Sequence, residues 1–267
     1  MRGAVADLAE QNDWNATVST LHGQFAGGVW RAVIFRDLIL REVRRRTGPV
    51  TLLDIGCGSG FDDSPELQKS LMAAADRYVG VEPDLSTPVQ DGIEVHRTSM
   101  EEARIEDSSI DVAYAVMVLE HLQDPKIFFD KLHQVLKPGG VFLGFTPNKR
   151  HYFVALSTLG ERLGVKDLYL RLLRPDKNER YVNFPTHYRC NSKADLEAVT
   201  CNFSDIRVFA LNRIGVLDYY LPKFARPIGS AFDHAWTAAG MPGSLMVCRI
   251  EKGSTSPATG HAATNRR

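Results

Sequence analysis

A short apolar segment that ends in a glycine-rich turn constrains the fold of this chain more than any other feature. Residues 50–55 have the composition of a buried strand, and Gly56, Gly58 and Gly60 follow it at alternate positions. Glycine has no Cβ, so the backbone N–H groups of such a turn can approach a ligand closely. A strand that leads through this turn into a helix therefore predicts a ligand site at the carboxyl end of that strand.

Strand and helix patterns continue to alternate after the turn. Ser64, Pro65 and Glu66 predict a helix start, because they supply a side-chain cap, a fixed first-turn backbone and an acid in the first turn. Later strands are predicted at 78–82, 93–97, 111–118, 141–145, 206–211 and 244–251, with a helix at 126–136. This alternation predicts an α/β fold in which helices cover both faces of a parallel sheet.

The remaining segments predict additions to a single domain that spans residues 1–252. Residues 1–48 have helical periodicity and end in an arginine run before Gly48 and Pro49, which are helix-stop signals. Residues 148–190 and 213–240 are expected to be insertions over the carboxyl edge of the sheet, and Ser192 with Asp195 predicts a further helix start. Residues 253–267 are small and polar and predict a disordered tail.

Charge and cysteine content narrow the class of protein. The chain has 32 lysines and arginines and 32 aspartates and glutamates, so its formal net charge is zero. The molecule as a whole therefore has no charge that attracts nucleic acid or anionic lipid, and a local basic patch remains an alternative. The four cysteines are scattered without a Cys-x-x-Cys pair, which argues against a zinc motif or a disulfide framework. No apolar run has the length of a membrane span and no leader segment is recognisable, so a cytoplasmic protein is expected.

The spacing within the turn favours a cationic ligand over a dinucleotide. Dinucleotide sites prefer Gly-x-Gly-x-x-Gly, whereas this turn has its third glycine one position earlier and continues into Phe61, Asp62 and Asp63. Two acids at this place would repel a pyrophosphate but tolerate a positive charge. Asp54 ends the first strand and can face a ligand ammonium, while Glu82 ends the second strand, where an acid binds ribose hydroxyl groups.

Four motifs together make residues 50–147 resemble the core of the class I S-adenosylmethionine-dependent methyltransferases of the small-molecule type. They are Leu53-Asp54-Ile55-Gly56-Cys57-Gly58-Ser59-Gly60, Val81-Glu82-Pro83-Asp84, Val118-Leu119-Glu120-His121-Leu122 and Leu136-Lys137-Pro138-Gly139-Gly140. The resemblance implies a Rossmann-like seven-stranded, mostly parallel sheet with helices on both faces, an antiparallel last strand and helical lid insertions. It also implies that S-adenosyl-L-methionine is the cofactor and S-adenosyl-L-homocysteine the product.

The resemblance further implies which residues hold this cofactor. The turn would hold its methionine part, Glu82 its ribose, and the ends of the third and fourth strands its adenine and methyl group. The matching positions are Asp54, Gly56, Cys57, Gly58, Gly60, Glu82, Pro83, Ser99, Met100, Ala115 and Met117. The family often has an aspartate where Ser99 stands, which weakens the adenine assignment, and Met100 fits a core position equally well.

Two histidines are candidates for the general base that a hydroxyl acceptor needs. His121 follows the fourth predicted strand at the ligand-binding edge, and His187 lies in an aromatic segment of the first insertion. Each could instead pack against its own loop. Substrate-binding candidates in the same insertion are His151, Tyr152, Tyr181, Tyr188 and Arg189. Glu120 could join the two histidines around a divalent ion, but no ligand spacing requires one, and no metal is predicted.

The sequence therefore predicts an enzyme that methylates a hydroxyl group of a small molecule such as a sugar or a natural product. Methylation of nitrogen or carbon, and cofactor binding without catalysis, remain open. Phe61 argues against a dehydrogenase, because a dinucleotide turn has glycine or alanine there. No nucleic-acid partner is expected, since the fourth strand lacks the Asn/Asp-Pro-Pro-aromatic motif of enzymes that methylate base amino groups. Tyrosines of the insertions could also join two copies in a homodimer.

Overall fold

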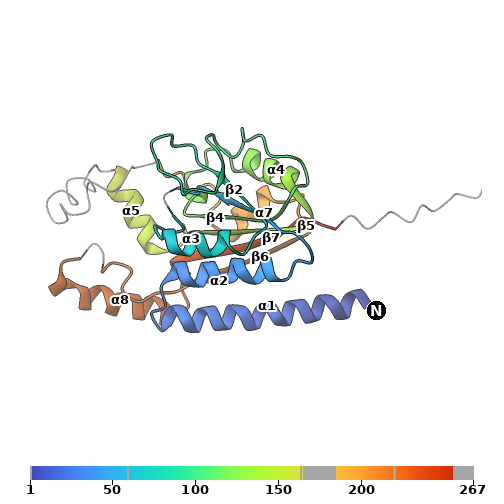
Figure 1. The fold of residues 1–267 in the computed structure, drawn as a ribbon. Helices are drawn as coiled ribbons and strands as arrows, with labels where there is room; N and C mark the ends of the chain where they lie inside the picture. Colours follow the sequence, from blue (N-terminus) through green and yellow to red (C-terminus); the bar gives the residue numbers. More distant parts are fainter. Residues whose placement is uncertain (1, 59, 163, 165–184, 219–220, 255–267) are drawn as a thin grey trace, which may run out of the picture.

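The computed structural model describes residues 2–58, 60–162, 164, 185–218 and 221–254. Seven strands form one sheet in the order β3-β2-β1-β4-β5-β7-β6, with helices on both faces (Figure 1). The strands are β1 (Thr51–Ile55), β2 (Arg77–Val81), β3 (Glu94–His96), β4 (Ile110–Val116), β5 (Leu136–Pro147), β6 (Asp205–Leu211) and β7 (Leu245–Glu251). The predicted fold class is confirmed.

Strand directions bring the ends of the central strands to one edge. β7 is antiparallel to β5 and β6, and every other pair in the sheet is parallel. β1 lies in register with both neighbours, so Asp54 is flanked by Gly80 of β2 and Tyr114 of β4. Ligands of such sheets bind outside the carboxyl ends of the strands, and the predicted turn lies there.

Two groups of helices cover the two faces, each with its own apolar cluster (Figure 1). Phe35 and Leu71 pack on one face, Phe128 and Leu196 on the other. The helices of the first face are α1 (Arg2–Ala26), α2 (Arg31–Arg44) and α3 (Pro65–Met72), and those of the second are α4 (Pro125–Val135) and α7 (Lys193–Val199). This burial on both faces explains why the central strands are apolar throughout.

Short-range signals determine where α3 and α7 begin. Oγ of Ser64 accepts the N–H of Leu67 at 3.3 Å, and Pro65 occupies the first helical position. Oγ of Ser192 accepts the N–H of Asp195, also at 3.3 Å. Both predicted helix starts are confirmed, because a cap depends only on residues within one turn.

The N-terminal helical region is two helices rather than one continuous helix. Gly27 and Gly28 separate α1 from α2, and Gly28 has a φ of +86°, which L side chains rarely adopt. The chain reverses at this point and the two helices lie side by side (Figure 1). Trp14 of α1 meets Phe209 of the edge strand β6, with ring centroids 5.6 Å apart.

β5 begins earlier than the sequence predicts. Leu136 already pairs with Ile110 of β4, and the regular register resumes at Val141 after an irregularity. Gly139 lies within the irregularity with a φ of +75°. The predicted helix-to-strand turn is therefore a bulge inside a longer strand.

Both segments predicted to be insertions contain helices. α5 (Tyr152–Arg162) follows β5, and the 3-10 turn η3 (Lys223–Ala225) with α8 (Arg226–Ala238) follows β6. Because β5 and β6 run in the same direction, both insertions leave the same edge of the sheet, and α5 and α8 lie at one end of the molecule (Figure 1). Tyr181, Tyr219, Tyr220 and residues 255–267 of the predicted tail lie outside the described residues. In the described part of the chain, no helix has the length and apolar character to cross a membrane.

Candidate functional site

The glycine-rich turn after β1 is tied to the end of β2 through its backbone. The N–H groups of Gly56 and Cys57 both donate to the carbonyl of Val81, at 2.8 and 3.1 Å. Gly56 has a φ of +80°, and a Cβ at this position would lie 2.6 Å from Cγ2 of Val118. A side chain at Gly56 is therefore excluded both by the backbone conformation and by the neighbouring segment.

Glu82, the first residue after β2, directs its carboxylate at the same turn. Its Oε2 accepts the N–H of Gly58 at 3.0 Å, and its Oε1 accepts the N–H of Asp84 at 2.9 Å. The side chain is buried, so two backbone donors hold the carboxylate in one position. The predicted ribose-binding acid and the predicted turn thus form one unit.

Asp54 lies in a buried polar network that the sequence analysis did not predict. Its Oδ2 accepts hydrogen bonds from Nε2 of Gln68 at 3.0 Å and from the hydroxyl of Tyr78 at 2.7 Å. The hydroxyls of Tyr78 and Tyr114 are also hydrogen-bonded to each other. Burial raises the pKa of Asp54, and the hydrogen bonds from Gln68 and Tyr78 oppose that rise. A signal for this network exists in the sequence, because a tyrosine stands in each of the two strands that flank β1.

The acidic pair after the turn does not present two free charges, which corrects one expectation. Nε and Nη2 of Arg31, the first residue of α2, donate to the two carboxylate oxygens of Asp62 at 2.8 and 2.7 Å. This bidentate pair neutralises one of the two acids that were expected to repel a pyrophosphate. Asp62 and Asp63 both have positive φ angles, of 47° and 65°. The sequence does not predict this pairing, because its two residues lie 31 positions apart.

The other predicted cofactor residues differ in exposure. Ala115 and Met100 are buried in the apolar cluster beneath α4. Ser99 is half-buried and Pro83 is exposed. Cys57 is buried, and this burial raises the pKa of its thiol to about 12, so the thiol is a neutral packing group. Contact between these residues and the cofactor remains a prediction.

Met117, the first residue after β4, has a strained backbone conformation. It has a φ of +56°, and its N–H donates to the carbonyl of Phe145 at 2.8 Å. β4 therefore stops at Val116, before the predicted end at Val118, and the chain enters the 3-10 turn η1 (Leu119–His121). Positive φ at a bulky residue is uncommon and is concentrated at ligand sites.

The residues around the turn fit a ligand that combines a positive charge with an adenosine. Gly56 and Gly58 expose backbone without side chains, and Glu82 supplies a carboxylate fixed beside them. S-adenosylmethionine has a sulfonium charge, an ammonium group and two ribose hydroxyls, which match an acidic turn whose glycines allow close approach.

One backbone carbonyl brings the two candidate histidines into adjacent segments. The carbonyl of Glu120 accepts the N–H groups of His187 and Tyr188, at 2.7 and 3.1 Å. His121 follows Glu120 in η1, and its Nδ1 lies 3.0 Å from the carbonyl of Pro185. The first insertion therefore crosses the end of β4 and meets η1 there.

The side chain of Glu120 connects η1 to the sheet beneath it. Its Oε2 accepts a hydrogen bond from the hydroxyl of Thr146 in β5 at 2.8 Å. The same hydroxyl accepts a hydrogen bond from Nδ2 of Asn191 at 2.6 Å. Burial raises the pKa of the Glu120 carboxyl. Glu120 thus joins η1 to β5 and to the segment before α7.

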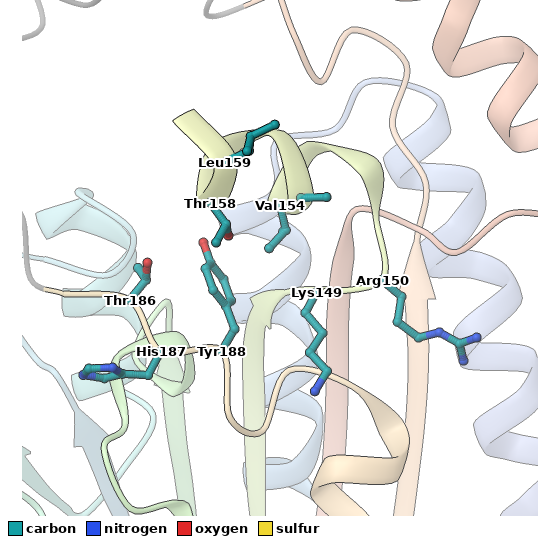
Figure 2. Close-up of a pocket in the computed structure, with 9 residues that line it drawn as sticks. Lys149, Arg150, Val154, Thr158, Leu159, Thr186, His187 and Tyr188 are labelled. Atoms are coloured by element: carbon teal, nitrogen blue, oxygen red, sulfur yellow. The ribbon is translucent and has the colours of Figure 1, made fainter. Parts of the chain in front are cut away.

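A pocket of about 760 Å³ lies between this crossing and α5 (Figure 2). Such a volume is typical of small-molecule sites. Figure 2 shows Tyr188 directed toward Thr158 of α5. The lining residues are Lys149, Arg150, Val154, Ala155, Thr158, Leu159, Thr186, His187 and Tyr188. The predicted candidates His187 and Tyr188 are among them.

Three other predicted substrate residues lie elsewhere. Buried His151 and half-buried Tyr152 pack against Trp236 of α8, at ring-centroid distances of 5.5 and 5.1 Å. The hydroxyl of Tyr152 donates to Asp233 of α8. Arg189 is exposed and donates to the carbonyl of Gln123. These contacts join the insertions to each other and to the core, and none of the three residues lines the pocket in Figure 2.

The described residues contain no group of three histidine, cysteine, aspartate or glutamate side chains suited to hold a metal ion. Glu120 and His187 do meet, but through the Glu120 carbonyl and the His187 N–H, while the Glu120 carboxylate faces Thr146.

A family model described as a methyltransferase domain matches residues 29–199. A probable S-adenosylmethionine-dependent methyltransferase of Mycolicibacterium smegmatis is 29% identical over 119 residues, which cover 42% of this chain and 44% of that protein. A ubiquinone biosynthesis O-methyltransferase of Chelativorans sp. is 29% identical over 48% of this chain and 55% of that protein. A sterol 4-C-methyltransferase of Caenorhabditis elegans is 29% identical over 39% of this chain and 35% of that protein.

The chain spans about half the length of the first two of these relatives. Among solved structures, the YcgJ protein of Bacillus subtilis has the same fold, with a TM-score of 0.51, 17% identity, and coverage of 82% of this chain and 98% of that one. The matched family segment contains the glycine-rich turn, Glu82 and His121. This chain therefore belongs to the class I S-adenosylmethionine-dependent methyltransferases.

Proposed function

We propose that this chain transfers the methyl group of S-adenosylmethionine to an oxygen atom of a small molecule, with a histidine as general base. The observation that carries the proposal is that His187, which lines the pocket in Figure 2, donates its N–H to the carbonyl of Glu120, the residue before His121. Bound S-adenosylmethionine supplies a methyl group on a positively charged sulfur. A hydroxyl acceptor must lose its proton as it attacks, and a base at this position serves that step. The O-methyltransferase relative also supports oxygen as the acceptor atom.

The Pro185 carbonyl determines which nitrogen of His121 acts as the base. A carbonyl oxygen only accepts hydrogen bonds, so Nδ1 of His121 carries the proton and donates it. Nε2 then carries the lone pair that removes the acceptor's proton. Pro185 and Glu120 act on the reaction only by positioning the two histidine segments.

The pocket walls indicate which acceptors this site favours. Tyr188 and Val154 offer an aromatic and an aliphatic surface, and Arg150 adds positive charge. Lys149 also lines the pocket, but its ammonium is paired with Asp195, with Nζ 2.5 Å from Oδ2. We expect an acceptor with an apolar body and an anionic or polar end.

Methylation of carbon is the second candidate, supported by the sterol 4-C-methyltransferase relative. O-methylation and C-methylation differ in the atom that receives the methyl group. Mass spectrometry and NMR of the methylated product locate the new methyl group on oxygen or on carbon.

The test measures methyl transfer from radiolabelled S-adenosylmethionine to a catechol, a benzoic acid hydroxylated on the ring, and a methyl glycoside. His121→Asn keeps a donor for Pro185 but has no basic nitrogen, and His187→Asn is its counterpart. The true base is expected to lose about 100-fold in kcat with cofactor binding unchanged. His234→Asn, on the exposed surface of α8, is the control. Full turnover in both His121→Asn and His187→Asn would disprove the general-base role.

A further inference from the structure

Helix α8 buries a carboxylate on its inward face and exposes large apolar side chains on its outward face. Asp233 is buried, where it accepts the hydroxyl of Tyr152 and the N–H groups of Gly215 and Val216, the latter two at 2.7 and 3.0 Å. Gly229 faces inward too, because a Cβ there would lie 2.9 Å from Cδ1 of Leu221. The inward face thus carries a carboxylate and a glycine beside Trp236, which packs on Tyr152, and it cannot rotate outward without losing these contacts.

The outward face of η3 and α8 is a continuous apolar stripe. Phe224, Ile228 and Phe232 follow each other at four-residue spacing and are 85, 74 and 50% exposed. Phe232 lies at the margin of the stripe, where its ring also contacts that of Tyr152 at a centroid distance of 4.7 Å. The helical positions between and beside them are also exposed and apolar: Pro227, Ala231, Ala235, Ala238 and Ala239. Single exposed apolar residues are ordinary, but an aligned stripe with two phenylalanines indicates an apolar partner.

The charges of the same insertion favour a negatively charged partner. Residues 212–240 contain two carboxylates, and Asp233 is buried while Asp218 is half-buried with its Oδ1 inside. Arg213 and Lys223 are exposed, and Arg226 is half-buried at the start of α8. The segment therefore presents cations beside its apolar stripe although the whole chain has no net charge.

We propose that η3 and α8 seat this end of the molecule on an anionic lipid surface, with Phe224 and Ile228 inserted among the acyl chains and Phe232 at the edge of the contact. An interfacial helix of this kind combines an aromatic and aliphatic face with lysine and arginine at its margins. A second copy of the chain is a poorer fit, because α8 has 13 residues. One face of such a helix measures about 20 Å by 10 Å, far below the roughly 800 Å² per partner of a stable dimer.

The position of α8 gives this docking a consequence for the reaction. α8 lies at the same end of the molecule as α5, which walls the pocket, and Tyr152 of α5 is bonded to Asp233 of α8 (Figure 1). Leu156 and Leu159 of α5 are exposed as well. This consequence rests on the proposed function. Docking through α8 would place the acceptor pocket beside the lipid, so that an acceptor with a hydrocarbon tail could enter the pocket from the membrane.

The test is flotation of the full chain with vesicles of phosphatidylcholine alone and of equimolar phosphatidylcholine and phosphatidylglycerol. Binding to the anionic vesicles is expected to be tighter by about tenfold or more. The double variant Phe224→Ser with Ile228→Ser should lose about tenfold or more of that binding, and Lys223→Glu should weaken binding to the anionic vesicles only. Ile127→Ser, on the exposed surface of α4, is the matched control and should bind as the unchanged protein does.

Three outcomes would overturn the docking. They are no preference for anionic vesicles, undiminished binding by the double variant, and a dimer that the double variant converts to a monomer in light scattering. Each variant is also checked for unchanged cofactor binding by calorimetry, which separates lost docking from lost folding. Vesicle binding without any methyl transfer would instead count against the proposed function and leave the docking intact.

Discussion

The carboxylate of Glu82 accepts the N–H of Gly58 at 3.0 Å, so the acid after β2 holds the glycine-rich turn after β1. Its second oxygen accepts the N–H of Asp84 at 2.9 Å. One side chain therefore fixes the two loops that the family places around the cofactor, and the proposed binding site depends on it.

Replacing Glu82 tests this dependence. Glu82→Gln turns one oxygen into an NH₂ group, which cannot accept a backbone N–H and removes the charge. S-adenosylmethionine affinity should fall about 10- to 100-fold, as expected for the loss of a charge-assisted hydrogen bond. Calorimetric titration measures it. The control is Glu94→Gln. Glu94 of β3 forms an exposed ion pair with Arg77 of β2, so this variant should bind the cofactor normally. Equal affinity in both variants would remove Glu82 from the site.

Gly56 offers a test of the steric argument. Gly56→Ala meets both a φ of +80° and Cγ2 of Val118 at 2.6 Å, whereas Gly139→Ala meets a φ of +75° with no atom within 4 Å. Gly139→Ala should cost about 1–2 kcal/mol of unfolding free energy and leave cofactor binding intact. Gly56→Ala should cost more and weaken binding. Adding Val118→Ala removes the colliding methyl group and should restore part of the loss. Without that rescue, the close approach of Val118 is not the cause.

The Arg31–Asp62 pair predicts a stability effect at the turn. Arg31→Ala leaves the nearly buried Asp62 carboxylate without its bidentate partner, so unfolding free energy should fall by about 1–2 kcal/mol. Urea denaturation measures it. Arg36→Ala breaks the neighbouring Arg36–Asp37 pair, whose acid is half exposed, and should change stability by about 0.5 kcal/mol or less. Similar losses in the two variants would mean that the bidentate geometry contributes nothing.

His151 predicts a pH dependence of stability. Burial lowers its pKa from 6.5 to about 4, although the nearby Asp233 opposes this, and its Nδ1 accepts the N–H of Phe153 at 3.2 Å. The unfolded chain therefore binds a proton at a higher pH than the folded one. The contribution of neutral His151 to the free energy of unfolding is fully present above pH 6.5 and is lost as the pH falls toward 4. This loss amounts to at most about 3 kcal/mol.

His151→Asn checks this by keeping an acceptor for Phe153 without a titrating ring. The decline in unfolding free energy between pH 7 and about pH 4.5 should be shallower in this variant than in the unchanged chain. His234→Asn, an exposed neighbour on α8, should keep the original slope. Identical slopes in all three proteins would show that His151 does not titrate differently on folding.

Local patterns predicted the order of the strands and helices, the turn and the position of Glu82 after β2. The caps at Ser64 and Ser192 act within one helical turn, and Gly56 and Glu82 follow strands whose apolar runs are visible in the chain. Such signals depend on near neighbours, and the parallel order of the strands brings their ends together. The sequence by itself therefore determined the α/β class and the family.

Only the tertiary structure decided which distant residues meet. Arg31 pairs with Asp62 across 31 positions and Tyr152 with Asp233 across 81, and no periodicity reports such contacts. The same holds for α8, since the sequence predicts an insertion at 213–240 but not which of its residues turn inward. Burial of Asp233 settles that orientation, because its carboxylate accepts donors from three other positions. Side-chain pairing depends on how separate segments are packed, and that arrangement is a property of the folded chain alone.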